Sequence, residues 1–177
     1  MKRATLLFCA AVAFQALILA GIPAEKIHTR LTGTPVLLKT APIDPYNIMS
    51  GYFVVLSYVI SNPEGVPGWK QYDNTRGDIF VVLEPDLTDE LGSWKAVRVS
   101  RDLPADLAPG QAVIKGRNNG WRIEFGIETY YIPETMRGTL DDLIRKNREN
   151  VRVAVKIAPS GASALTGMKI GTSTYDY

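Results

Sequence analysis

The sequence predicts an all-β domain, mainly an antiparallel sandwich or barrel with one short helix, preceded by an N-terminal transmembrane helix. Short stretches rich in β-branched and aromatic residues recur between turns that contain glycine and proline. One later stretch carries helix signals, and the first residues form a long uncharged apolar run. We expect three parts: residues 1–24 as a membrane anchor, 25–34 as a linker and 35–177 as an exported β-rich domain.

The apolar run extends from Ala4 to Ala24, 21 residues without a charge. At 1.5 Å per residue, a helix of this length crosses roughly 30 Å of hydrocarbon. A cleaved signal peptide is the alternative, but neither Ala20 nor Ala24 provides a small-x-small cleavage site. We therefore favour a retained anchor, with the lipid bilayer as the partner of residues 4–24.

Two basic residues before the run, Lys2 and Arg3, indicate the orientation of the anchor. They predict a single-pass protein of the inner (plasma) membrane whose N-terminus stays in the cytoplasm and whose C-terminal domain is extracytoplasmic. Lys26 and Arg30, on the other side of the run, weaken this bias.

Charge and composition exclude several function classes. Of the 20 basic residues, 18 follow the apolar run together with all 18 acidic residues, so the exported part has no formal net charge. This argues against nucleic acid or acidic lipid headgroups as the principal partner. Cys9 lies inside the apolar run and His28 is the only histidine, which excludes a cysteine-based metal site and a Ser-His-Asp triad in the domain. We expect no cofactor.

The elements of the domain follow from residue patterns. The segment 52–61 is apolar on both alternating faces and is predicted to be a central strand covered on both sides. Residues 62–77 contain two prolines and three glycines and should form a loop. We expect strands over residues 35–41, 52–61, 78–84, 94–101, 112–117, 121–127 with a continuation over 129–132, 151–157 and 164–170, and an edge strand over 174–177.

Asn118-Asn119-Gly120 predicts a hairpin between residues 112–117 and 121–127. In its second arm an apolar face of Trp121, Ile123, Phe125 and Ile127 alternates with charged residues. The one helix expected in the domain covers residues 139–149, because Thr139 can cap it, acidic residues fill its first turn and basic residues its last.

The segment from Gly51 to Tyr58, GYFVVLSY, resembles the motif after which the GDYXXLXY family is named. Gly51, Leu56 and Tyr58 occupy motif positions, whereas Tyr52 replaces the aspartate and Phe53 the first tyrosine. The lead-in at residues 44–46 and the segment 120–134 resemble further parts of the family. The resemblance implies a membrane-anchored bacterial protein with an exported β-rich domain, no established activity and a companion multi-spanning membrane protein.

Glu124 and Glu128 are the most evident acidic pair. Four residues along a strand separate them by about 13 Å, beyond the roughly 5–9.5 Å of paired glycosidase carboxylates. A solvated charged face is the better interpretation, and a cation site formed with Glu134 is the alternative. Trp69 and Tyr72, in the predicted loop, are candidates for a contact surface.

We therefore expect no catalytic residue and favour a membrane-anchored domain that binds or supports a partner integral membrane protein. The alternative is a degenerate signal-peptidase-like or other hydrolase. It would require Ser50 to approach a lysine such as Lys95, Lys115 or Lys156.

Overall fold

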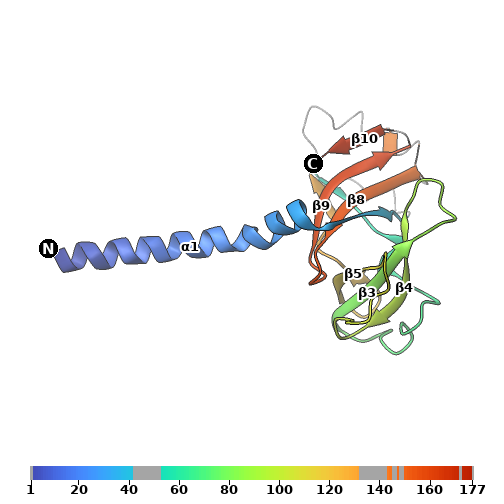
Figure 1. The fold of residues 1–177 in the computed structure, drawn as a ribbon, viewed down its shortest axis with the longest axis horizontal. Coiled ribbons are helices and arrows are strands. Elements are labelled where there is room, and N and C mark those ends of the chain that lie inside the picture. The colour runs from blue at the N-terminus through green and yellow to red at the C-terminus, as the bar shows by residue number, and fades with distance from the viewer. Residues whose placement is uncertain are drawn as a thin grey trace.

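The computed structural model describes residues 2–41, 53–131, 143–144, 147, 150–171 and 173–176. A long helix, α1 (Lys2–Thr32), projects from a β-rich domain and contacts it only near the helix C-terminus (Figure 1). Among the described residues, no single helix meets the length and hydropathy expected of a membrane span. Taken together, the segments Thr5–Leu19 and Pro23–Thr32 have the length and composition of a membrane span, and they are bent by 42° at the break between them.

The helix extends through the segment for which the sequence predicted a polar linker. Residues 24–32 contain neither proline nor glycine, and several of them are good helix formers. Gly33 follows the last turn, and its N–H donates to the carbonyl of Thr29 at 2.8 Å. A Cβ at Gly33 would lie 2.6 Å from that carbonyl oxygen and 2.9 Å from the backbone nitrogen of Ile157. The end of α1 therefore lies against the sheet at a distance that only glycine permits.

The described strands form one large mixed sheet of eight strands in the order β10-β9-β8-β1-β4-β3-β5-β6, and a two-stranded sheet of β2 and β7. The strand bounds are β1 (Thr34–Lys39), β2 (Phe53–Val55), β3 (Gly77–Pro85), β4 (Trp94–Ser100), β5 (Ala112–Asn118), β6 (Ile123–Glu124), β7 (Thr129–Tyr131), β8 (Val151–Ile157), β9 (Ser163–Ile170) and β10 (Ser173–Asp176).

The sheet is mixed because β1 pairs in parallel with β4, with Leu38 opposite Trp94, and antiparallel with β8. The other described pairs are antiparallel, as predicted. The predicted sandwich or barrel is replaced by one bent sheet, in which the N–H of Lys115 on β5 donates to the carbonyl of Gly161 in the β8–β9 turn at 2.8 Å. Strand patterns fix which side chains face inward but leave the choice of neighbouring strand open.

The bend encloses a core of alternating apolar side chains from the central strands. On β8 the buried residues Val153, Val155 and Ile157 alternate with partly exposed ones. Further core residues on the other strands are Val36, Leu38, Ile79, Val81, Leu83, Val99, Ile114, Met168 and Ile170.

The predicted central strand over residues 52–61 is wrong. Only Phe53–Val55 form a strand, in the small sheet, and a 3-10 helix η1 (Val59–Ser61) follows. Between them the N–H of Leu56 donates to the carbonyl of Glu128, and Tyr58 forms an isolated bridge with Thr40. The segment is apolar because its residues contact several elements in succession, rather than because one strand is covered on both sides.

The predicted helix over residues 139–149 lies mostly outside the described residues. Leu143 and Ile144 are helical, and the N–H of Asn147 donates to the carbonyl of Leu143 at 3.0 Å, the i to i−4 bond of an α-helix. Ile144 is buried in the core.

Candidate functional site

The described residues of the GYFVVLSY segment are structural. Tyr58 is 1% exposed, and its hydroxyl donates to the carbonyl of Ile127 at 2.6 Å. Burial raises the pKa of Tyr58 well above its ordinary value, and the nearby charge of Glu128 adds to the effect. Leu56 belongs to the core and Phe53 pairs with Tyr131. Gly51 and Tyr52 lie outside the described residues.

The hairpin at Asn118-Asn119-Gly120 forms as predicted, with Asn118 opposite Ile123. The side-chain oxygen of Asn119 accepts from the N–H groups of Trp121 and Arg122 and fixes the turn. The second arm is only two residues long, because the chain turns at Gly126, which has a φ of 73°.

This turn separates Glu124 from Glu128, which do not share one strand face as the alternation had predicted. The carboxylate of Glu124 accepts from Asn119 and Arg122. That of Glu128 accepts the N–H of Phe125 and closes the turn at Gly126. Each carboxylate stabilises its own turn, and Glu134 lies outside the described residues. Among the residues described, no three His, Cys, Asp or Glu side chains are grouped to hold a metal ion.

The prediction that Trp69 lies on a contact surface is wrong, because Trp69 is 4% exposed and belongs to the core. Tyr72 packs against the core, with the guanidinium of Arg101 over its ring at 5.5 Å. Trp121, predicted to face inward, is instead 72% exposed, and the guanidinium of Arg122 lies over its ring at 5.4 Å. Loop position alone is therefore a poor guide to aromatic burial here.

The three lysines considered for a hydrolase have other contacts. Lys115 forms an ion pair with Asp78 at 2.8 Å, and Lys95 lies near the carboxylates of Glu84 and Asp86. Lys156 donates to the carbonyl of Leu31 in the last turn of α1 at 3.2 Å. Ser50, the nucleophile that this alternative requires, lies outside the described residues.

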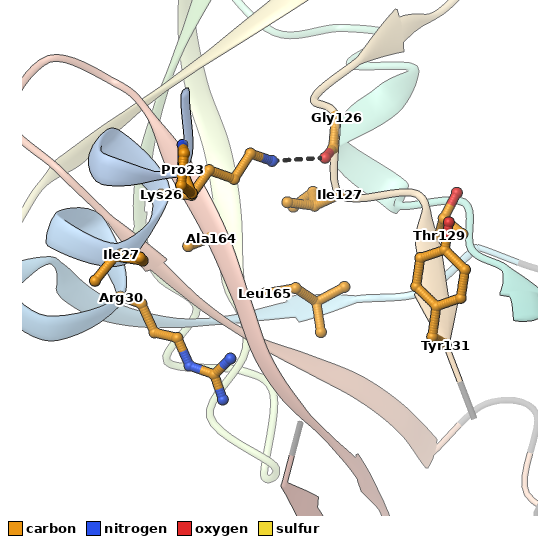
Figure 2. Close-up of a pocket in the computed structure, with 10 residues that line it drawn as sticks. All are labelled: Pro23, Lys26, Ile27, Arg30, Gly126, Ile127, Thr129, Tyr131, Ala164 and Leu165. Atoms are coloured by element: carbon orange, nitrogen blue, oxygen red, sulfur yellow. Dashed lines mark hydrogen bonds between the residues drawn. The ribbon is translucent and has the colours of Figure 1, made fainter. Parts of the chain in front are cut away.

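A groove of about 330 Å³ lies where α1 meets the domain (Figure 2). Lys26 spans it, and its ammonium donates to the carbonyl of Gly126 at 3.3 Å, whereas Arg30 extends away from Lys26 along the helix. Leu165 and Ile127 lie between the helix and Tyr131. The lining residues are Pro23, Lys26, Ile27, Arg30, Gly126, Ile127, Thr129, Tyr131, Ala164 and Leu165.

The groove combines two cationic side chains, which point in different directions, with an apolar surface. Sequence reasoning missed it because its residues come from three distant segments: α1, residues 126–131 and the start of β9. Only the spacing of Pro23, Lys26, Ile27 and Arg30 on one helix face could have indicated it.

Comparison with known families agrees with the resemblance of the GYFVVLSY segment. The model of the GDYXXLXY protein family matches residues 15–168, from within α1 to β9. No curated protein and no solved structure matches the chain. Because the family model covers most of the sequence, the chain belongs to the GDYXXLXY protein family.

Proposed function

We propose that this protein is a membrane-tethered, extracytoplasmic β domain that binds or supports a partner integral membrane protein. The tether is residues 4–24 of α1, and the domain lies outside the inner (plasma) membrane.

The observation that carries the proposal is the exposed apolar surface of α1. Leu6, Phe8 and Leu17 are each about 70% exposed, and the helix extends away from the sheet (Figure 1). An exposed apolar surface without charges is unfavourable in water and favourable in hydrocarbon. Lys2 and Arg3 precede this surface, which supports a cytoplasmic N-terminus.

Exposed aromatic residues on the domain support a protein partner. Trp121 and Tyr131 present large exposed rings, and such residues are enriched at the centres of protein interfaces. The family match begins inside α1, which supports helix and domain acting as one unit.

Affinity purification from cross-linked, detergent-solubilised membranes tests the partner. With a tag after Tyr177, the full chain should recover an integral membrane protein, and Trp121→Ala should reduce its recovery several-fold. The matched control is an unrelated β domain fused to residues 1–33, which retains the helix and loses the domain surface. Recovery of the same membrane proteins by the full chain and by this control would contradict a partner specific to the domain.

A further inference from the structure

We propose that α1 contains a hinge at Gly21 and Pro23, through which the β domain changes its tilt on the membrane. The hinge divides the helix into two limbs. The membrane limb is Thr5–Leu19, and the domain limb is Pro23–Thr32. This use of the hinge rests on the proposed function, because it requires the membrane limb to lie in the bilayer.

The domain limb is held against the sheet. Lys26 donates to the carbonyl of Gly126 at 3.3 Å. Lys156 on β8 donates to the carbonyl of Leu31 at 3.2 Å. Between these two bonds, Thr29 is 1% exposed, and α1 contacts both β8 and β9. Because these contacts lie at both ends and in the middle of the domain limb, this limb moves together with the sheet.

The membrane limb has a different environment. All the side chains of residues 5–19 are exposed, and this part of α1 extends away from the sheet (Figure 1). The contacts that hold the domain limb therefore do not fix the direction of the membrane limb. Its direction relative to the domain depends on the backbone between the two limbs, where they are bent by 42°.

The residues at this bend weaken the helix. Pro23 lies inside α1 and has no N–H to donate to the carbonyl of Leu19, and in a straight helix its ring would clash with that carbonyl. Gly21 has the greatest backbone freedom of any residue. A Cβ at Gly21 would meet nothing within 4 Å, so no close packing requires glycine there. A missing bond and a flexible residue thus coincide between the two limbs.

The position of the hinge suits a change of tilt. Gly21 and Pro23 are near the end of the apolar run, whose last residue is Ala24. With residues 4–24 in the hydrocarbon, the hinge lies at its extracytoplasmic boundary. Rotation there changes the angle at which the domain faces a partner and leaves the span in place.

Distances between pairs of spin labels test the hinge in the full chain in detergent micelles. In a Cys9→Ala background, Leu7→Cys labels the membrane limb, and Leu87→Cys or Lys70→Cys labels the exposed surface of the domain. The matched control replaces Leu7→Cys by Glu25→Cys, which labels the domain limb. We expect both distance distributions from residue 7 to be broader than those from residue 25 by about 10 Å or more, because residue 7 lies at the end of a lever of about 24 Å.

The double variant Gly21→Ala/Pro23→Ala locates the flexibility. It restores the N–H at position 23 and should straighten and stiffen α1. Closing a bend of 42° moves residue 7 by about 17 Å relative to the domain. We therefore expect the distributions from residue 7 to narrow to the width of the control and their centres to shift, whereas those from residue 25 stay unchanged.

Three results would overturn the proposal. Wild-type distributions from residue 7 as narrow as those from residue 25 would show a rigid bend. Broad distributions that persist in Gly21→Ala/Pro23→Ala would place the flexibility elsewhere. Broad distributions from residue 25 would show that the domain limb is not fixed to the sheet. Because the measurement in micelles needs no particular topology in cells, its failure is distinguishable from failure of the tether.

Discussion

Replacing Tyr58 by alanine is expected to lower the free energy of unfolding by about 3–5 kcal/mol, the range for buried aromatic side chains. Tyr58 is fully enclosed where residues 40, 56–61 and 127 meet. Tyr58→Phe should cost about 1–3 kcal/mol, because the carbonyl of Ile127 loses its 2.6 Å donor inside the protein. Urea denaturation of the full chain in detergent measures both changes.

The pH dependence gives a second measurement on Tyr58. Its folded-state pKa is raised, so the stabilising contribution is complete below the unfolded pKa of about 10 and is lost as the pH rises above it. Tyr58→Phe should remove this part of the alkaline dependence. Trp121→Ala, at an exposed site, should change stability by about 0.5 kcal/mol or less. A loss for Tyr58→Ala no larger than for Trp121→Ala would refute the structural role of the motif.

Asp89→Asn is expected to lower stability by about 3–5 kcal/mol, because it leaves a buried guanidinium without its carboxylate. The side chains of Arg152 and Asp89 are 3% and 14% exposed. Two hydrogen bonds of 3.1 and 2.8 Å join them and link β8 to the β3–β4 connection. The double variant Arg152→Met/Asp89→Leu should be less destabilised than Asp89→Asn, since it removes both members of the buried pair.

The exposed pair of Arg98 and Asp106 provides the control. It is also joined by two hydrogen bonds, both of 2.8 Å, but its side chains are 38% and 73% exposed. Asp106→Asn should therefore cost at most about 1 kcal/mol. Equal losses of stability in Asp89→Asn and Asp106→Asn would show that burial does not increase the contribution of the ion pair to stability.

Acid also tests the pair. Hydrogen bonding from Arg152 holds the pKa of Asp89 far below its ordinary value. The stabilisation is present above the unfolded pKa of about 4 and is lost as the pH falls below it. Asp89→Asn should flatten the stability profile between about pH 4 and pH 2. A profile with the wild-type slope in this variant would assign the acid dependence to other groups.

The strands that were predicted most accurately from the sequence are those in which apolar and polar residues alternate regularly over several positions. β5, β8 and β9 lie within a residue or two of the expected ranges, because alternation and flanking turns agree there. The linker was missed because polarity suggested an exposed segment, whereas good helix formers continue α1 until Gly33.

The prediction of one strand over residues 52–61 was wrong because an apolar run indicates that a segment is buried but does not indicate which elements bury it. Trp69 and Trp121 exchanged their expected environments for a related reason: packing of a loop against the core and of a hairpin tip against solvent depends on tertiary contacts. The groove at Lys26 depends on the same contacts and had no local signal beyond one helix face.

The most direct test of the tether is the topology of the intact chain. A reporter that is active only outside the cytoplasm, fused after Tyr177, should be active, and the protein should stay in membranes after a carbonate wash with residues 1–24 present in its intact mass. Val12→Asp/Phe14→Asp should reduce this retention, because charged residues in the apolar run are costly in hydrocarbon. Activity only from a cytoplasmic reporter, or release of the wild type by the wash, would contradict a membrane-tethered extracytoplasmic domain.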